Sequence, residues 1–221
     1  MAVPGKGTSG YRAVADLAWE RLGALQLEEV MARAGAEKAG GGVWKIPLFG
    51  RSCTIHMREM LVLDHRDRKA GVTVEIVLLH YILGSRDVPL SGDLKSFREF
   101  EGAEAFQDAF RRRVIEPLAQ TFGPCPERFA SAARELGGIP AGFGTGDFNF
   151  RIPALPRLPV VCILWLGDDE VRPSAQVLFD GTASSQVHVE DLAVVGEFAA
   201  FLLMEAAGLE SDSVGRIFSY G

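Results

Sequence analysis

The chain has 221 residues, of which 48% are hydrophobic and 24% charged, so it is within the size range of one large domain. Its formal net charge of −6 gives it no positive field for binding phosphate backbones, and we expect no nucleic-acid partner. Apolar runs stay below the roughly 20 residues that a membrane-spanning helix needs. Cys53, Cys125 and Cys162 form no CxxC pair, so we expect a cytoplasmic protein in a reducing compartment, away from membranes.

In the first third of the chain, the apolar residues between 9 and 36 recur at helical spacing and predict one bent helix or two short ones. Segments 43–49 and 52–57 are rich in β-branched and aromatic residues, which is typical of strands. Gly50-Arg51 separates them and predicts a hairpin. A third strand is expected over 59–64.

The middle of the chain is mainly helical in its pattern. Residues 72–83 are apolar on nearly every side, which indicates a central, buried helix. A short helix is expected over 96–100, and a longer one over 104–122 that must bend or restart at Pro117. Residues 127–136 form a further amphipathic pattern, which Gly137-Gly138 would close as a C-cap.

Strand patterns return over residues 147–152, 160–166 and 175–179, and a final helix is expected over 190–207. The connection between the last two strands is too short for a parallel crossover, so these strands should form a hairpin. Helices and strands are segregated in blocks, which favours an α+β fold with a mainly antiparallel or mixed β-sheet packed with helices. We predict a single domain over 1–221, with frayed termini at about 1–8 and 209–221.

Asp168, Asp169 and Glu170 form the densest acidic cluster and are candidate ligands for a divalent cation. Such residues are also common in turns, and no His or Cys lies beside them in the sequence. A structural turn is therefore favoured over a metal site. Asp180 would lie at the far end of the hairpin, roughly 15 to 20 Å away at about 3.3 Å per strand residue. An ion pair between Asp180 and Arg157 is a structural alternative for that carboxylate.

His80 is placed among apolar residues in the helix expected to be most buried. Its ring then either has a hydrogen-bond partner, as a core histidine does, or serves as an axial ligand to a haem, a corrinoid or a metal. A structural histidine of the core is favoured. The chain has no HExxH pattern, no GxSxG elbow and no GxGxxG followed by a helix, which leaves a zinc site, a serine nucleophile and a dinucleotide site without a motif.

Five segments together resemble the family called domain of unknown function 3786, over roughly residues 10–205. They are IPLFGRSCTI, LLHYILGS, SGDLKSFREFEGAEAFQDAFRRRVIEPLAQTFG, GTGDFNFRI and LPRLPVVCILWLGDDEVRPSAQVLFDGTAS. The family occurs mainly in anaerobic bacteria and archaea. Some relatives resemble fusions to a four-cysteine iron–sulfur module, which implies a redox or one-carbon enzyme as partner. This chain has no cysteine quartet, so no intrinsic iron–sulfur cluster is expected.

The resemblance implies a set of candidate ligand-binding positions. These are His80, Tyr81, Phe97, Arg98, Asp147 and Trp165, with Asp168 and Glu170 nearby in the last motif. Aromatic and basic residues recur among them without a nucleophile and base pair, which favours a non-catalytic module that binds a small molecule or a cofactor such as haem or corrinoid.

Two other functions remain open. The first is a metal-dependent hydrolase that uses Asp168, Asp169 and Glu170 with a histidine from another segment, around an open coordination position. The second is an interaction protein that acts through its C-terminal helix. The apolar residues of that helix are Phe198, Phe201, Leu202 and Leu203, although simple packing against the sheet would also explain them.

Overall fold

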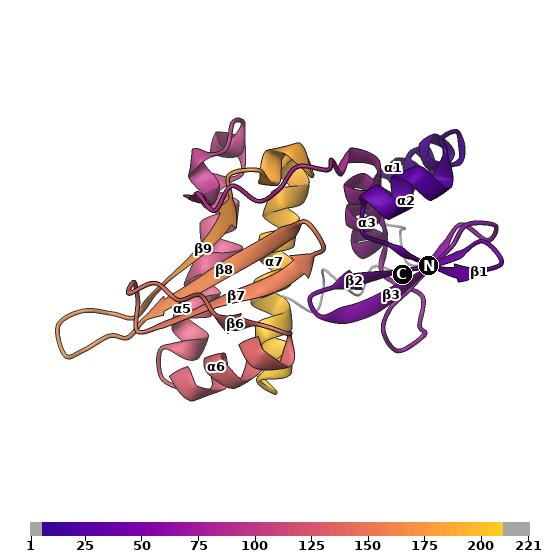
Figure 1. The fold of residues 1–221 in the computed structure, drawn as a ribbon. Coiled ribbons are helices and arrows are strands. Elements are labelled where there is room, and N and C mark those ends of the chain that lie inside the picture. Colours follow the sequence, from indigo (N-terminus) through magenta and orange to yellow (C-terminus); the bar gives the residue numbers. More distant parts are fainter. Residues whose placement is uncertain (1–5, 210–221) are drawn as a thin grey trace, which may run out of the picture. The chain divides into compact units, whose positions relative to one another are not determined.

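The computed structural model describes residues 6–209 and contains two antiparallel sheets with helices, so the α+β class is confirmed (Figure 1). Within these residues the chain divides into two compact units. The first unit comprises residues 6–46 and 52–87, and the second comprises residues 47–51 and 88–209. The organisation as one domain stays a prediction. Most of the termini expected to be frayed, 1–5 and 210–221, lie outside the described residues.

The first unit combines three helices with a four-stranded meander in the order β1-β2-β3-β4. Its elements are α1 (Lys6–Gly23), α2 (Leu27–Arg33), β1 (Glu37–Gly40), β2 (Val43–Leu48), β3 (Arg51–His56), β4 (Leu61–Leu63) and α3 (Val72–Gly84). The helical pattern over 9–36 thus forms two helices, and α1 begins at Lys6, inside the segment expected to be frayed. The strand β1 was not predicted, because its residues are all exposed and show no apolar alternation.

The helix α3 is the buried helix that its sequence predicts, since eight of its residues are buried. One of them, Glu75, is only 3% exposed and is neutralised by α1. Arg12 donates two hydrogen bonds of 2.9 Å to its carboxylate, and the Trp19 indole N–H donates a third of 2.6 Å. This buried charge is therefore paired and hydrogen-bonded, as a buried carboxylate must be.

The turn between β2 and β3 consists of Phe49 and Gly50, one residue earlier than predicted. Both have positive φ, 49° and 70°, which is the conformation of a two-residue hairpin turn. A Cβ at position 50 would also come within 2.7 Å of the Leu136 carbonyl oxygen, so only glycine fits there. This turn belongs to the second unit, where the Phe49 ring is fully buried and its N–H donates to the Ala154 carbonyl at 2.8 Å.

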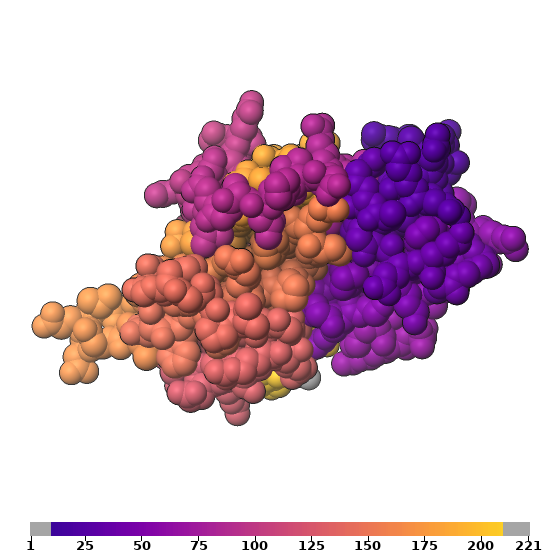
Figure 2. Space-filling model, in the orientation of Figure 1, coloured from indigo at the N-terminus to yellow at the C-terminus, as the bar shows by residue number. Residues whose placement is uncertain are grey.

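The second unit is built on a five-stranded antiparallel sheet in the order β5-β9-β8-β7-β6. Its strands are β5 (Leu94–Ser96), β6 (Ile139–Pro140), β7 (Phe148–Leu155), β8 (Leu158–Trp165) and β9 (Ser174–Asp180). Its helices are η1 (Phe97–Glu99), η2 (Ala103–Ala105), α4 (Gln107–Phe110), the π-helical η3 (Arg111–Ile115), α5 (Glu116–Phe122), α6 (Pro126–Glu135), η4 (Ala183–Ser185) and α7 (Val189–Ala206). The predicted β8–β9 hairpin is confirmed. Its loop extends beyond the sheet (Figure 1) and protrudes from the surface of the second unit (Figure 2).

The helix predicted over 104–122 runs without a gap from Gln107 to Phe122, as α4, η3 and α5, and changes from α-helical to π-helical turns before Pro117. A short 3₁₀ turn precedes α4, and the π-helical turn η3 lies directly before α5, which has Pro117 in its first turn. Proline lacks the N–H that would continue an α-helical ladder, and a widened turn before it accommodates the ring. The end of α6 follows the prediction: Gly137 and Gly138 donate to the carbonyls of Arg134 and Ala133, which is a Schellman motif.

The helices α5 and α6 pack on one face of the sheet, and α7 packs against them and against η3. In α7, Phe198, Leu202 and Leu203 are buried in the second unit, and Phe201 is half-buried. Packing within the unit accounts for the three buried residues, and a role of this helix as a partner surface stays a prediction. No helix within residues 6–209 is long and apolar enough to cross a membrane.

Candidate functional site

The sheet of the second unit has an incomplete edge at β9. The short strand β5 pairs with β9 only from Leu94 opposite Asp180 to Ser96 opposite Leu178. On the other side, β8 pairs with β9 from Ser174 to Phe179. Within residues 6–209, the part of β9 from Ser174 to Val177 therefore has no strand partner on the β5 side.

The end of β5 is set by local chemistry at Ser96. Its backbone N–H donates to the Glu99 carboxylate at 2.7 Å, and its hydroxyl contacts the same oxygen at 2.5 Å, which forms a capping box for the 3₁₀ turn η1. The chain consequently turns out of the sheet at Phe97. These hydrogen bonds from Ser96 hold the pKa of Glu99 below its usual value, so the carboxylate stays charged and the cap stays formed.

The start of β5 is fixed by Asp180, which is 3% exposed. Its carboxylate accepts hydrogen bonds from the backbone of Ser91, Gly92 and Thr182, at 2.7 to 3.0 Å, and from the hydroxyls of Ser91 and Thr182. Desolvation raises the pKa of Asp180, but these hydrogen bonds outweigh it and lower the pKa below its ordinary value. These contacts correct the predicted pairing with Arg157: the carboxylate joins the segment before β5 to the turn after β9.

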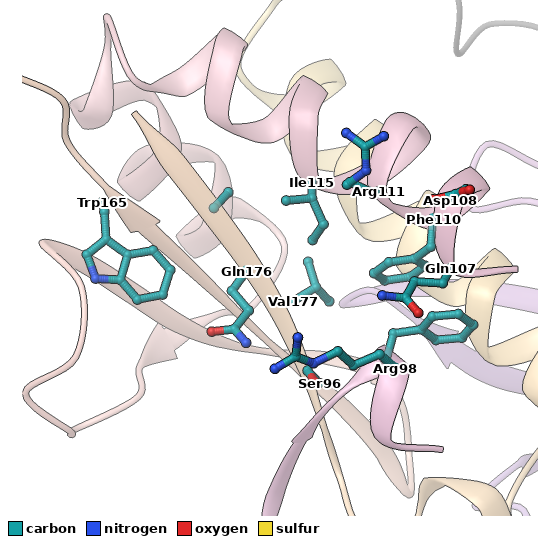
Figure 3. A pocket seen from close by; sticks show the side chains of 12 residues that line it. Ser96, Arg98, Gln107, Asp108, Phe110, Arg111, Ile115, Trp165, Gln176 and Val177 are labelled. Carbon is teal, nitrogen blue, oxygen red and sulfur yellow. The ribbon is translucent and has the colours of Figure 1, made fainter. Parts of the chain in front are cut away.

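A cavity of about 340 Å³ lies at the incomplete edge, and we call it the β9-edge groove (Figure 3). Its lining comes from the end of β5, η1, α4, η3, the end of β8 and the open part of β9. The lining residues are Ser96, Phe97, Arg98, Gln107, Asp108, Phe110, Arg111, Ile115, Trp165, Ala175, Gln176 and Val177. All of them belong to the second unit.

One wall of the groove is aromatic and rigidly packed. The rings of Phe97 and Phe110 are stacked, with centroids 4.3 Å apart and an interplanar angle of 12°. Phe110 in turn packs on α7, where a Cβ at Gly196 would lie only 2.3 Å from its ring. Phe179 in β9 contacts the same ring from the sheet, at 6.3 Å between centroids. The wall is therefore preformed and held from three elements.

The position of the groove relative to β9 follows from the alternation of side chains along a strand. Ala175, Gln176 and Val177 are consecutive, so they cannot all point to one face of the sheet. Because all three line the groove, it lies along the edge of the strand. Figure 3 shows Gln176 and Val177 between Trp165 at one end and Phe110 at the other.

The groove also contains a few polar groups. Arg111 is paired with Glu116, whereas Arg98 forms no hydrogen bond or ion pair within residues 6–209, apart from a longer-range attraction to Glu99. The amides of Gln107 and Gln176 supply neutral donors and acceptors. A groove with apolar walls and one exposed guanidinium beside them suits a ligand that has an apolar part and an anionic group.

The structure brings three of the six candidate ligand-binding residues together, since Phe97, Arg98 and Trp165 line the groove. Asp147 does not line it: its carboxylate accepts the Leu166 N–H at 2.7 Å and fixes the start of the β7–β8 pairing. His80 and Tyr81 belong to α3 in the first unit, where the Tyr81 hydroxyl donates to the Ala34 carbonyl at 3.2 Å. The β9-edge groove therefore contains neither of them.

The acidic cluster forms the turn that the sequence favoured. Asp168 accepts hydrogen bonds from the N–H groups of Glu170 and Val171, at 2.9 and 2.7 Å, and these lower the pKa of its carboxyl. Asp169 and Glu170 are exposed in the same loop, beside a second hollow of about 410 Å³ near Gly123 and Pro173. Within residues 6–209, no group of three or more His, Cys, Asp or Glu side chains is arranged to hold a metal ion.

The β9-edge groove offers no axial protein ligand to a haem iron. Such a ligand would be His, Cys, Met or Tyr, and none of these residue types lines the groove. His80, which suggested the ligand, is in the first unit.

Several lining residues were not predicted. In the sequence, three of them have the pattern of ordinary core residues: Phe110, Ile115 and Val177. They line the groove because η3 packs beside the edge of β9. Gln176 carried the one local signal: it is a polar residue in the otherwise apolar run Ala175–Phe179, which is typical of a strand whose one face or edge is open.

The fold and the groove together define an α+β protein with an antiparallel sheet and a preformed groove at its β9 edge. The chain belongs to the family described as domain of unknown function DUF3786, whose model matches residues 26–201. This match confirms the resemblance drawn from the five sequence segments. No curated protein and no solved structure matches the chain.

Proposed function

We propose that the protein is a non-catalytic binding module and that the β9-edge groove holds an organic ligand with an apolar body and an anionic group. The observation that carries the proposal is the groove of about 340 Å³, in which the stacked rings of Phe97 and Phe110 lie near the Arg98 guanidinium. Ligand pockets have this volume and this combination of apolar walls and few polar anchors.

The chemistry of the groove also explains why we propose binding instead of catalysis. Its titratable side chains are Arg98, Asp108 and Arg111, and Arg111 is already paired with Glu116. Such a set can orient and neutralise an anion. The hydroxyl of the lining residue Ser96 is held by Glu99 in the capping box of η1, where it has a structural role. The accessory role in redox or one-carbon metabolism that the family resemblance implies is part of the same proposal.

The test uses 8-anilinonaphthalene-1-sulfonate, a dye with an aromatic body and a sulfonate, as the probe. We expect one dye molecule per chain, with energy transfer from Trp165 that the Trp165→Phe variant removes. Arg98→Gln should weaken binding about fivefold, because it removes a charge-assisted contact worth about 1 kcal/mol at a partly open site.

Arg112→Gln is the matched control, because Arg112 is exposed in the π-helical turn η3, next to the lining residue Arg111, but does not itself line the groove. It removes the same net charge and should leave dye affinity unchanged. Equal losses in the two variants would show that only the overall charge matters, and unaltered binding in Arg98→Gln would contradict the proposed site.

A further inference from the structure

The open backbone of β9 faces the groove. Gly181, directly after β9, donates its N–H to the Asp93 carbonyl at 2.7 Å, toward the β5 side. In an antiparallel sheet the main-chain groups of successive residues point alternately to the two neighbouring strands. Phe179, Val177 and Ala175 therefore direct their N–H and C=O groups to the β5 side, as Gly181 does. For Phe179 the partner is Lys95 of β5, whereas Val177 and Ala175 lie beyond the end of β5.

From this arrangement we propose that the natural ligand of the groove is an extended peptide segment of a partner protein, which pairs antiparallel with Ser174–Val177 and continues the line of β5. The inference rests on the proposed function, because it names the class of ligand for the same groove. An added strand would satisfy the main-chain groups of Ala175 and Val177, which is the usual source of affinity when a peptide extends a sheet.

The two sides of the groove predict which peptide side chains fit. Ala175 and Val177 point to the helical face, toward the wall that contains Phe110 and Ile115, so one peptide residue should be apolar. Gln176 points to the opposite face, and Trp165 points there as well because it pairs with Ser174. Figure 3 shows Arg98 reaching to the Gln176 side. The neighbouring peptide residue should therefore be acidic, and its carboxylate would pair with Arg98.

The length of the open edge limits the segment. Ser174–Val177 spans about 13 Å at roughly 3.3 Å per residue, so about three to four peptide residues pair with it. Ser96 marks one end, where β5 leaves the sheet, and Trp165 marks the other. The partner segment is thus a short strand of alternating apolar and acidic residues.

The experiment selects binders to the full-length chain from a phage-displayed library of random seven-residue peptides. A selected peptide is then synthesised with a single N-methyl group at each position in turn. Because N-methylation removes one donor, methylation of the residues facing β9 should weaken binding by about tenfold or more, and methylation of the alternate residues should have little effect. In the chain, Ala175→Pro removes an open N–H without breaking a hydrogen bond to β8, and should weaken peptide binding similarly.

The dye titration on the same preparation separates the two proposals. If the dye binds in an Arg98-dependent way but no peptide is selected, or if methylation effects do not alternate, the strand-pairing inference is overturned and the binding module stands. If neither the dye nor a peptide binds, both proposals fail. Because the methylation scan uses the unaltered chain, the test stays decisive even where Ala175→Pro does not fold.

Discussion

Asp180 is the single residue that most directly organises the groove, because its carboxylate fixes both the start of β5 and the turn after β9. Its pKa is lowered in the folded chain relative to an unfolded value near 3.9. The group therefore stabilises the fold above about pH 4, and this contribution is lost as the pH falls.

We expect Asp180→Asn to lower the free energy of unfolding at pH 7 by about 2 kcal/mol, because the hydrogen bonds to one carboxylate oxygen then have a neutral acceptor and the Gly92 N–H meets an NH₂ donor. The difference from the unaltered chain should shrink as the pH approaches 3. Chemical denaturation at several pH values measures both quantities, and a difference that does not depend on pH would contradict this role of the carboxylate.

The cysteines give a second prediction at the residue scale. Burial raises the pKa of the Cys162 thiol to about 12, and burial, with a smaller contribution from Asp64, does the same for Cys53. Cys125 is half-buried, and its thiol lies 3.1 Å from the Thr121 carbonyl. A disulfide reagent at pH 8 should therefore modify Cys125 first, and Cys53 and Cys162 only after denaturation. Rapid modification of all three in the native chain would show that the units open readily.

At the same scale, the sequence predicted some site residues and missed others for a physical reason. Phe97, Arg98 and Trp165 were predicted because they lie in the motifs of the family resemblance. Phe110 and Val177 were not predicted, since an apolar residue has the same local pattern whether its side chain faces a core or a groove. Asp147 and His80 were grouped with the site by motif alone, and spacing along the chain does not fix which residues meet.

At the scale of elements, α7 supports the aromatic wall of the groove through one glycine. Gly196→Ala would place a Cβ 2.3 Å from the Phe110 ring, so the ring or the helix must shift. We expect this variant to lose about 1–3 kcal/mol of stability, as overpacked cores do, and to bind the dye more weakly. Thermal unfolding and dye titration test both effects.

Gly23→Ala is the matched control, because the same substitution near the end of α1 meets no atom within 4 Å. It should be neutral or stabilise the chain by up to about 1 kcal/mol through helix propensity. Equal effects at positions 23 and 196 would mean that the contact with Phe110 does not support the groove.

The elements that the sequence predicted well are those with a strong period or a strong capping signal. The buried helix α3, the β8–β9 hairpin and the Schellman end of α6 belong to this group. The strands β1 and β5 were missed because they are short and exposed or half-exposed, and depend on pairing with a neighbour that is already in place. Part of the edge of β9 is open because β5 is short. Since β5 was not predicted, the groove could not be predicted from the sequence either.

On the scale of the whole molecule, the turn at Phe49 contributes a fully buried ring to the second unit from a segment distant in sequence. Arg51, next to this turn, forms ion pairs with two other residues of the second unit. Its guanidinium nitrogens lie 2.7 Å from the Glu205 carboxylate and 3.5 Å from the Glu135 carboxylate. We expect Phe49→Gly to cost about 2–4 kcal/mol, since loss of the ring outweighs relief of the left-handed backbone.

Met60→Gly makes the corresponding change at another residue with positive φ, 48°, whose side chain is 56% exposed. It should leave the stability unchanged or raise it by about 1 kcal/mol, because glycine accepts this conformation without strain. Comparable losses in the two variants, measured by chemical denaturation, would contradict the importance of the buried ring.

The most direct test of the β9-edge groove as the binding site is a ¹H–¹⁵N spectrum of the chain during titration with 8-anilinonaphthalene-1-sulfonate. The chain has three indole N–H signals, which Trp→Phe variants assign. Trp165 lines the groove, whereas Trp19 and Trp44 are buried in the first unit. We expect the Trp165 indole signal to shift saturably, together with the amides of Ala175–Val177, while the other two indole signals stay in place. Shifts at Trp19 or Trp44 with Trp165 unmoved would contradict this expectation.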